Sequence, residues 1–538
     1  MGHYMPHIKN SGCSNINHQT LMTRLFPLLP SLIILLTVVG CNTKKNTNKN
    51  LTVKTTYGEI KGVKEDSVFA FKGIPYAKAE RFMPPQDPDA WEEVLDCKEF
   101  GPVAKQKVAW IDDSDTDENN LFSINVWTNG INDEKKRSVM FWLHGGGFHV
   151  GSSNDPMTYG KALAEKGDVV VVSVNHRLNI LGFLDLSAYG KEYTKSANVG
   201  MLDVVKALEW VRNNIENFGG NPSDVTIFGE SGGGGKVGTL MCMPAAKGLF
   251  HKAIIQSGTL LNVMTKEKSQ ELGNKVVEKL NLSADQLRKI DSISYEDLVE
   301  AGNAAISEIS GPRKPGSPTM FGFAPSVDGS VLLQQPFSPD FADISKNIPL
   351  MIGTTLNELI KTAYSEKDLT MVQAKERLSE TYGEKTDNFV NLYEEAYPNY
   401  TPQDLLSIDT VFRPNTIKTA DEWSSASNAP VYAYLLTWKS PVENASKGSF
   451  HGLDIPLAFN TVDLREDWTG NSEEAWNLSE KMSSAWLNFA KSGNPNVSEE
   501  LPEWQPYTKE NGVTMLFDEN CKIITNHDRK LMQLISEQ

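Results

Sequence analysis

DVTIFGESGGGG, residues 224–235, is the stretch on which the interpretation of the whole chain depends. The part up to Glu230 is rich in apolar and β-branched residues, which predicts a buried strand, and the glycine run predicts a tight turn into a helix. Residues 229–233 read Gly-Glu-Ser-Gly-Gly, so Ser231 is expected on the turn, with the next backbone N–H pointing where an oxyanion forms. The pattern predicts a nucleophilic serine; the alternative is a glycine-rich turn with an idle serine.

The same residues partly match a phosphate-binding loop of the form G-x-x-x-x-G-K-[ST]. Counting back from Gly235-Lys236, the first glycine position holds Glu230, and Val237 stands where the hydroxyl should be. A carboxylate inside the cradle would repel phosphate, so the sequence argues against this alternative.

Strand-like and helical patterns alternate on both sides of this stretch. Strands are predicted at 138–146, 168–175, 224–230, 251–258 and 348–355, and a helix at 202–215. This alternation predicts an α/β fold with a mostly parallel central sheet flanked by helices. The amphipathic stretches 262–310 and 366–396 are too long for simple crossovers, so we expect them to form a helical cap region. No linker interrupts residues 52–538, which predicts one domain.

Charge and length narrow the class of protein further. The 538 residues carry 52 Lys and Arg against 68 Asp and Glu, a formal charge of −16, and 40% of them are hydrophobic. This is a globular composition. The acidic balance argues against a nucleic-acid partner, because a phosphate backbone repels such a surface.

Residues 1–41 are predicted to be an export signal. The apolar run at 25–39 follows Arg24 and contains two prolines, which fits a secretory core segment better than a membrane-spanning helix. Residues 38–41, Val-Val-Gly-Cys, resemble the lipobox of bacterial lipoproteins, which implies lipidation of Cys41; the alternative is plain secretion with cleavage nearby. The polar residues 42–51 should form a flexible tether. We therefore expect an exported protein held at a bacterial cell-envelope membrane by a lipid anchor alone.

Three cysteines remain in the expected mature chain: Cys97, Cys242 and Cys521. Their wide spacing gives neither a disulfide framework nor a metal-site pattern. We expect three isolated thiols and no metal; one disulfide pair is the alternative in an exported protein.

A second glycine-rich turn, His144-Gly145-Gly146-Gly147, follows a predicted strand. Residues without side chains let backbone N–H groups touch a substrate oxygen, so this turn is predicted to complete an oxyanion hole. The alternative is a simple turn at the end of a strand. That alternative loses weight because both glycine-rich turns occur in one domain and in the expected order.

The partners of Ser231 should follow it in the order acid, then histidine. Of nine histidines, only His451 and His527 lie far enough beyond Ser231, and His451 begins HGLDIPLAF, a loop that runs into an apolar stretch. We therefore predict His451 as the base.

Three carboxylates compete for the place of the acid. Glu358 lies at the expected carboxyl end of a strand, Asp328 sits in an Asp-Gly turn dipeptide, and Asp454 follows the histidine and so has the wrong order. Glu358 is preferred, and the other two stay open at this point.

With these residues in place, the chain resembles the type-B carboxylesterases, the cholinesterase-like branch of the α/β-hydrolases. The resemblance runs from about residue 52 to about residue 507 and therefore covers nearly the whole expected mature chain. The matching stretches are FKGIPYA (71–77), RFMPP (81–85), INVWT (124–128), HGGGF (144–148), VNHRLNILGFL (174–184), ALEWVRNNIENFGGNPSDVTIFGES (207–231), GLFHKAIIQSG (248–258), VDG (327–329), GTTLNE (353–358), HGLDIPLAF (451–459) and FAKSGNPN (489–496).

The resemblance implies a Ser-His-Glu triad with Ser231 as the nucleophile, Glu358 as the acid and His451 as the base. It implies an ester hydrolase that works through an acyl-enzyme intermediate and needs no cofactor. The substrate would be a small-molecule, glycan or lipid ester. Two alternatives stay open: a catalytically inactive, adhesion-type relative, and an amide or thioester hydrolase with the same triad.

The resemblance also assigns supporting roles around the triad. The amides of Gly146, Gly147 and Gly232 would form the oxyanion hole. Glu230 would be a carboxylate beside the site, and Ser257 would belong to the hydrogen-bond network behind it.

The sequence departs from the family in the acid motif and in the segment before INVWT. The acid motif usually ends Asp-Glu-Gly and here reads Asn-Glu-Leu at 357–359, while residues 118–122 read Glu-Asn-Asn-Leu-Phe instead of Ser-Glu-Asp-Cys-Leu. The second change is expected to remove both the carboxylate that pairs with Arg81 and the cysteine that bonds Cys97.

Two single residues also stand out. Trp110 lies in the variable region and either lines the entrance to the site or is an ordinary loop aromatic. Lys236 replaces a small residue in the helix after the nucleophile.

Overall fold

The computed structural model describes residues 51–311, 322–338, 340–359, 362–496 and 501–537. The predicted signal segment, the lipidation site Cys41 and most of the tether lie outside these residues. In the described part of the chain, a mixed sheet of eleven strands runs through the molecule, and a second sheet has three strands. No helix in this part is long and apolar enough to cross a membrane.

The strands of the large sheet follow one another in the spatial order β14 (Lys522–Thr525), β13 (Val513–Phe517), β12 (Val431–Leu436), β11 (Leu350–Thr355), β10 (Lys252–Gln256), β9 (Gly220–Glu230), β7 (Arg137–Leu143), β8 (Val170–Val174), β6 (Ser123–Thr128), β4 (Val68–Pro75) and β3 (Val63–Glu65). The small sheet holds β1 (Thr52–Lys54), β2 (Glu59–Lys61) and β5 (Leu95–Asp96). Pairing is parallel from β13 through β8 and antiparallel at both ends of the large sheet. The predicted mostly parallel sheet is therefore confirmed.

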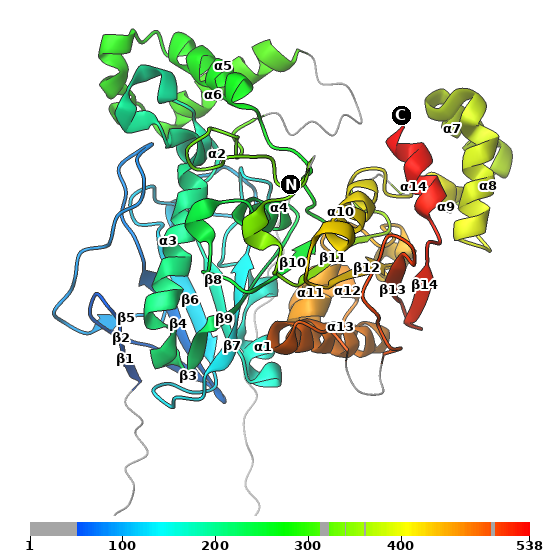
Figure 1. Ribbon diagram of the computed structural model, residues 1–538, viewed down its shortest axis with the longest axis horizontal. Coiled ribbons are helices and arrows are strands. Elements are labelled where there is room, and N and C mark those ends of the chain that lie inside the picture. The colour runs from blue at the N-terminus through cyan, green and yellow to red at the C-terminus, as the bar shows by residue number, and fades with distance from the viewer. Residues whose placement is uncertain (1–50, 312–321, 339, 360–361, 497–500, 538) are drawn as a thin grey trace, which may run out of the picture. The chain divides into compact units, whose positions relative to one another are not determined.

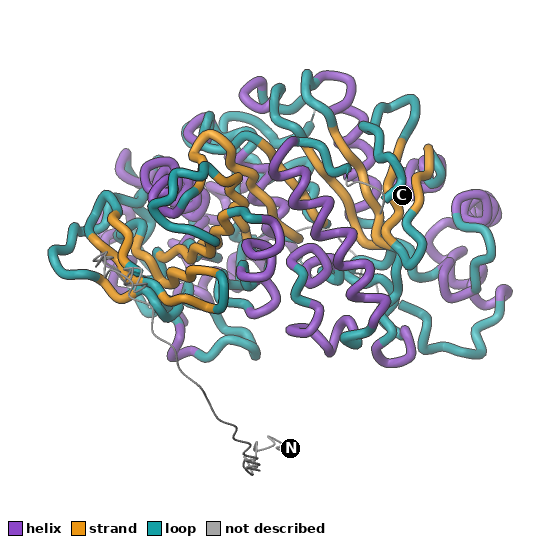
Figure 2. Tube along the Cα trace, turned by 90° about the horizontal axis from the view of Figure 1, so that it is seen from below, coloured by secondary structure: helices purple, strands orange, loops and turns teal. Residues whose placement is uncertain are grey.

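The α-helices lie on both sides of this sheet (Figure 2). They are α1 (Lys161–Gly167), α2 (Asn179–Phe183), α3 (Val199–Asn214), α4 (Gly232–Leu240), α5 (Lys266–Lys279), α6 (Tyr295–Ser310), α7 (Met371–Tyr382), α8 (Thr386–Ala396), α9 (Pro402–Leu405), α10 (Phe412–Ala426), α11 (Asp454–Phe459), α12 (Glu466–Thr469), α13 (Glu473–Ser492) and α14 (Arg529–Ser536).

Side-chain alternation along each strand divides the core into two layers. In β7, Phe141 and Leu143 pack into the core that includes Leu208 of α3, whereas Trp142 packs into the core that includes Trp486 of α13. Successive residues of a strand point to opposite faces, so a strand covered by helices on both faces is apolar throughout. All seven residues of β7 are buried, as this arrangement requires.

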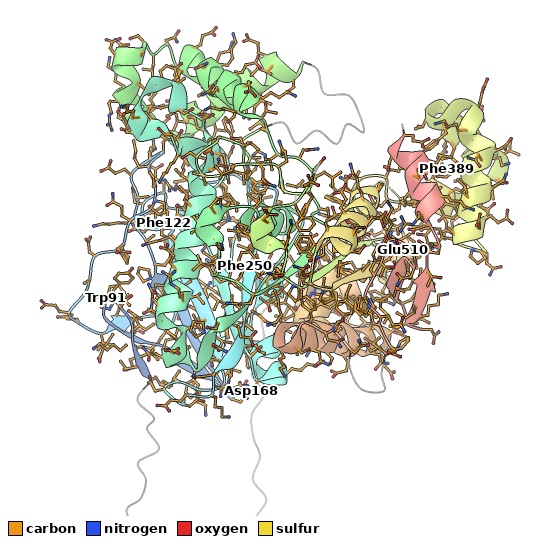
Figure 3. All side chains as sticks on the ribbon, viewed as in Figure 1. Trp91, Phe122, Asp168, Phe250, Phe389 and Glu510 are labelled. Atoms are coloured by element: carbon orange, nitrogen blue, oxygen red, sulfur yellow. The ribbon has the colours of Figure 1, made fainter. Side chains whose placement is uncertain are left out.

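The predicted helical cap region consists of two separate helix pairs. Helices α5 and α6 pack against each other, and Figure 1 shows them beyond the end of α3. Helices α7 and α8 form a third apolar core with α14, to which Phe389 of α8 belongs (Figure 3). The two pairs therefore pack against different parts of the molecule.

Candidate active site

Ser231 stands on the turn between β9, near the middle of the large sheet, and α4. Its backbone has φ 57° and ψ −124°, a conformation that L-residues rarely adopt. The turn is held because the Ser231 N–H donates to the Gln256 carbonyl at 2.9 Å. A Cβ on Gly233 would lie 2.0 Å from the Leu143 carbonyl oxygen, so only glycine lets α4 approach β7 this closely. The predicted strand–turn–helix is confirmed, and tight packing maintains the strained serine.

The second glycine-rich turn meets this one directly. A Cβ on Gly232 would lie 1.9 Å from the Gly147 carbonyl oxygen. Gly146 and Gly147 have φ of 87° and 65°, which favour glycine. Among the described residues, the N–H groups of Gly146 and Gly147 donate to no protein atom, and the N–H of Gly232 is at the first turn of α4, where helix amides have no intrahelical acceptor. The structure thus brings the three predicted amides into one neighbourhood with no competing acceptor.

His451 lies directly against Glu358. The imidazole Nδ1 is 2.5 Å from Glu358 Oε2, and the His451 N–H donates to the Glu358 carbonyl at 3.3 Å. The other carboxylate oxygen, Oε1, accepts the Thr355 N–H at 2.8 Å. The ring of Phe412 stacks on the imidazole at 5.3 Å with an interplanar angle of 7°. Glu358 therefore fixes both the orientation and the tautomer of His451.

The two rival carboxylates occupy other places. Asp328 Oδ1 accepts three successive backbone N–H groups at 330–332, so Asp328 stabilises a turn. Asp454 accepts hydrogen bonds from Gln256 Nε2 at 3.0 Å and Tyr434 Oη at 2.8 Å. Neither of the two is hydrogen-bonded to His451.

The rival histidine, His527, makes its contacts with residues other than Ser231 and Glu358. It packs edge-on against Tyr397, and neither ring nitrogen makes a hydrogen bond within the described part of the chain. Burial is the largest cause that lowers the pKa of His527, to about 4.

The other ring nitrogen of His451 faces Glu230, the residue before the serine. Nε2 lies 3.3 Å from Glu230 Oε1, although the angles do not make a hydrogen bond. No hydrogen bond joins the Ser231 hydroxyl to His451 in this structure; instead, the imidazole lies beside the turn that carries the hydroxyl. The contact between Glu230 and His451 was not predicted, because only the fold places Nε2 next to residue 230.

Buried carboxylates dominate the electrostatics of the site. Burial raises the pKa of Glu230 to about 8; His451 opposes this shift, while Asp454 and Glu358 add to it. Burial by itself lowers the pKa of His451, but Glu230, Glu358 and Asp454 outweigh burial and raise it to about 10. Burial is also the first cause that raises the pKa of Asp409, to about 7, with Glu358 as the second. The imidazole thus lies among buried carboxyl groups whose negative charge favours its protonated form. Asp409 was missed from the sequence.

A cavity of about 960 Å³ opens onto the two turns and the imidazole. Its lining includes Gly146, Glu230 and His451. Its outer wall includes Trp110, which is 70% exposed, so of the two alternatives for this residue the structure favours the entrance. The guanidinium of Arg465 lies 3.6 Å from the ring centre of Trp468, and both residues line the cavity. No sequence pattern pointed to the last two residues.

Ser257 lies behind the site in a backbone conformation with φ 47°. Its N–H donates to the Gly353 carbonyl at 2.8 Å, but its buried hydroxyl has no hydrogen-bond partner within the described residues. A role for Ser257 in this region is therefore not carried by a hydrogen bond of its hydroxyl.

The expectation that Arg81 loses its carboxylate is wrong. Glu118, the first residue of the altered segment 118–122, accepts hydrogen bonds from the Arg81 guanidinium, at 2.8 Å from Nη2 and 3.1 Å from Nε. The long Glu118 side chain supplies the carboxylate although the neighbouring motif residues have changed. Cys97, Cys242 and Cys521 are free, which confirms the predicted isolated thiols.

Within the described residues, no group of three or more His, Cys, Asp or Glu side chains is arranged to hold a metal ion. The groups that the structure does bring together are a serine on a strained turn, an imidazole held by a carboxylate and a set of unused backbone amides. On a mostly parallel sheet covered by helices on both faces, this site defines an α/β-hydrolase of the serine type.

Comparisons with known proteins give the family. A model of the carboxylesterase family matches residues 49–534. The chain is 35% identical over 488 residues to para-nitrobenzyl esterase of Bacillus subtilis (strain 168), covering 88% of this chain and 95% of that protein. It is 32% identical to cocaine esterase of Homo sapiens, covering 82% of each chain. The chain belongs to the carboxylesterase family and is a carboxylesterase-type hydrolase.

A solved structure agrees with this assignment. An esterase of Clostridium hathewayi, described as hydrolysing aliphatic aromatic polyesters, has a TM-score of 0.81 to this chain and is 33% identical. The alignment covers 91% of this chain and 98% of that one.

Proposed function

We propose that the chain hydrolyses carboxylic esters through an acyl-enzyme on Ser231, with His451 as the proton carrier and Glu358 as its partner. The single observation that carries this assignment is the 2.5 Å contact between His451 Nδ1 and Glu358 Oε2 beside the strained serine turn. A carboxylate in this position holds the imidazole in the tautomer that leaves Nε2 free to accept a proton, and it stabilises the imidazolium that then forms.

The reaction follows in two half-reactions. Ser231 Oγ attacks the ester carbonyl while His451 Nε2 takes the hydroxyl proton. The proton then passes to the leaving alkoxide, the alcohol departs, and the acyl group stays on Ser231. Water enters, gives its proton to His451 and attacks the acyl carbonyl, and collapse of the second intermediate returns the proton to Ser231 and frees the acid. For this step His451 Nε2 turns from Glu230 to the Ser231 hydroxyl, since catalytic contacts of this kind commonly form fully only when substrate binds.

The developing oxyanion is proposed to bind the N–H groups of Gly146, Gly147 and Gly232. These amides have no competing acceptor in the described structure, so no hydrogen bond has to break before they donate. Each donor of this kind is worth roughly 3–4 kcal/mol to the transition state in comparable sites.

The substrate class is proposed to be small esters with one bulky, partly apolar side, and acyl groups on glycans or lipids belong to the same proposal. A cavity of about 960 Å³ has room for such a group, and the Trp110 and Trp468 rings offer it apolar faces. The relatives named for p-nitrobenzyl and polyester substrates support a broad ester range.

A panel of p-nitrophenyl esters from acetate to dodecanoate, with matched p-nitroanilides, tests this reaction class. We expect turnover of at least the short esters, and anilides slower by about a hundredfold or more, because amide cleavage depends more strongly on protonation of the leaving group. Equal rates on both series would contradict the ester assignment in favour of an amidase.

We also propose that the mature chain is exported and anchored through a lipid on Cys41. The apolar run at 25–39 and the residues Val-Val-Gly-Cys at 38–41 support this proposal. The mass of the N-terminal peptide of the mature protein tests it; a peptide that begins elsewhere, or that lacks acyl groups, would contradict it.

Glu230 provides a test of how the site sets the protonation of His451. A charged Glu230 raises the pKa of His451, and only the neutral imidazole can accept the serine proton. Glu230→Gln removes this charge, so the rise of kcat/KM with pH should occur at a pH lower by about one unit. The measurement is the pH profile of kcat/KM for p-nitrophenyl acetate.

The matched control for this prediction is Asp467→Asn, which removes a carboxylate that lines the same cavity and is paired with Arg465. This variant should leave the profile in place. A profile of Glu230→Gln that stays unchanged, or moves to higher pH, would show that Glu230 does not control the imidazole.

A further inference from the structure

A buried lysine lies behind the glycine-rich turn of residues 144–147. Lys236 of α4 is completely buried, and its Nζ donates to the His144 carbonyl at 2.9 Å. Helix side chains lean towards the helix N-terminus, so a residue one turn beyond Ser231 reaches back under both turns. No carboxylate pairs with Lys236 among the described residues, and burial lowers its pKa to about 7.

The groups that face the ammonium are neutral. The rings of His144 and His176 stack at 5.1 Å, and burial, first among the causes, lowers the pKa of both well below the ordinary value. The ring of Phe148 presents its face at 6.0 Å from Nζ. Burying a cation without a counter-ion is costly, and a small or apolar side chain would fill the place without that cost. The lysine therefore needs an explanation beyond packing.

The His144 carbonyl, which Lys236 holds, is the first of three successive backbone carbonyls that each have a polar partner. The carbonyl of His144 accepts from Lys236, and that of Gly145 is 2.8 Å from His144 Nδ1. The carbonyl of Gly146 accepts the N–H groups of residues 149 and 150 at 3.2 and 3.1 Å. In a trans peptide the carbonyl and the following N–H point in opposite directions, so holding each carbonyl directs the next N–H the other way.

Lys236 hydrogen-bonds the carbonyl of the first of these three peptides, the one between His144 and Gly145. It thereby also holds His144, whose ring lies against the carbonyl of the second peptide. The N–H groups on the second and third peptides, those of Gly146 and Gly147, have no acceptor in the described structure. We propose that Lys236 is a positioning residue of the oxyanion hole: by hydrogen-bonding the His144 carbonyl it fixes the peptide plane that directly precedes the two planes carrying the N–H groups of Gly146 and Gly147. The inference rests on the proposed function and assigns it a further residue.

Lys236→Met tests this role, because methionine fills a similar space and cannot donate. A misdirected oxyanion hole weakens the transition state more than the ground state. We expect kcat for p-nitrophenyl acetate to fall by about tenfold or more with KM changed less than twofold, and the inhibition constant of an aryl trifluoromethyl ketone to weaken in parallel with kcat/KM. The concentration of competent enzyme is set by titration with a fluorophosphonate, which corrects for misfolded protein.

The control is Lys252→Met. Lys252 of β10 is also a buried lysine, but it pairs with Asp224 away from the cavity. Its loss should lower the melting temperature and leave kcat and the ketone inhibition constant unchanged. If Lys236→Met yields too little folded protein, Lys236→Ala replaces it in the same comparison.

The outcomes separate this inference from the proposed function. Lys236 variants that keep kcat and ketone inhibition within twofold of the parent would overturn the positioning role. A parent chain that neither hydrolyses esters nor reacts with the fluorophosphonate would instead overturn the proposed function itself.

Discussion

Ser231→Ala should lower kcat for p-nitrophenyl acetate by about 10⁴- to 10⁶-fold, because no other group can take over the covalent step. Without the hydroxyl, His451 has no nucleophile to activate, and only the oxyanion hole and substrate binding remain to promote attack by water. The variant should also lose all labelling by a fluorophosphonate probe. Rates and labelling are measured on protein whose circular dichroism spectrum and melting temperature match those of the parent.

The control for the serine variant is Ser483→Ala, which removes a buried hydroxyl of α13 that bonds Ser479 and Lys166 outside the cavity. It should cost about 1 kcal/mol of stability and leave turnover intact. Labelling that persists at a second serine in the Ser231→Ala protein would refute the assignment of the nucleophile.

The second large effect is expected for Glu358→Gln. The Thr355 N–H holds one side-chain oxygen at this position, so the NH2 group of a glutamine would face His451 Nδ1 and could not accept Nδ1–H, and a neutral amide cannot stabilise the imidazolium. We expect kcat to fall by about 10³- to 10⁴-fold with little change in KM. The measurement is steady-state kinetics on a p-nitrophenyl ester at the optimum pH of the parent.

Asp454→Asn is the matched comparison. Asp454 is also buried, and of the two rival carboxylates it is the one whose charge raises the pKa of His451. Its oxygens serve Gln256 and Tyr434, so its replacement should lower kcat by less than about tenfold. A larger loss for Asp454→Asn than for Glu358→Gln would exchange the roles of the two acids.

The centre of the fold was predictable because its strands are continuous apolar runs. Segments such as DVVVVSVN at 168–175 are buried on both faces, and a short, continuous run of β-branched residues favours a strand over a helix. The shortest antiparallel strands were harder: β3, at one end of the large sheet, and β1 and β2 of the small sheet have only three residues each and mix charged with apolar side chains. Two-residue alternation over so short a length does not separate a strand from a loop.

The candidate site divides in the same way. Ser231, Glu358 and His451 could be proposed because turn chemistry and chain order mark them, and the structure joins the last two directly. Phe412, which stacks on the imidazole, and Asp409, beside Glu358, carry no such mark. They reach the site only through packing of α10, which depends on contacts between residues distant in sequence. Lys236 could be noticed as unusual, but its acceptor is a backbone atom that no sequence pattern identifies.

The walls of the cavity are formed by residues that lie farther from the strands of the large sheet than the residues of its floor do. The floor includes the turn directly after β7 and Glu230 at the end of β9, whereas Trp110, Met157, Arg465 and Trp468 lie farther from the strands, within the long connections between them. Connections of this kind tolerate insertion and exchange far better than sheet strands do. Selection or engineering can therefore change which alcohol and acid groups of a substrate are accepted, while the catalytic residues stay the same. In this fold, a new substrate preference therefore depends on exchanged connecting segments and does not require new chemistry.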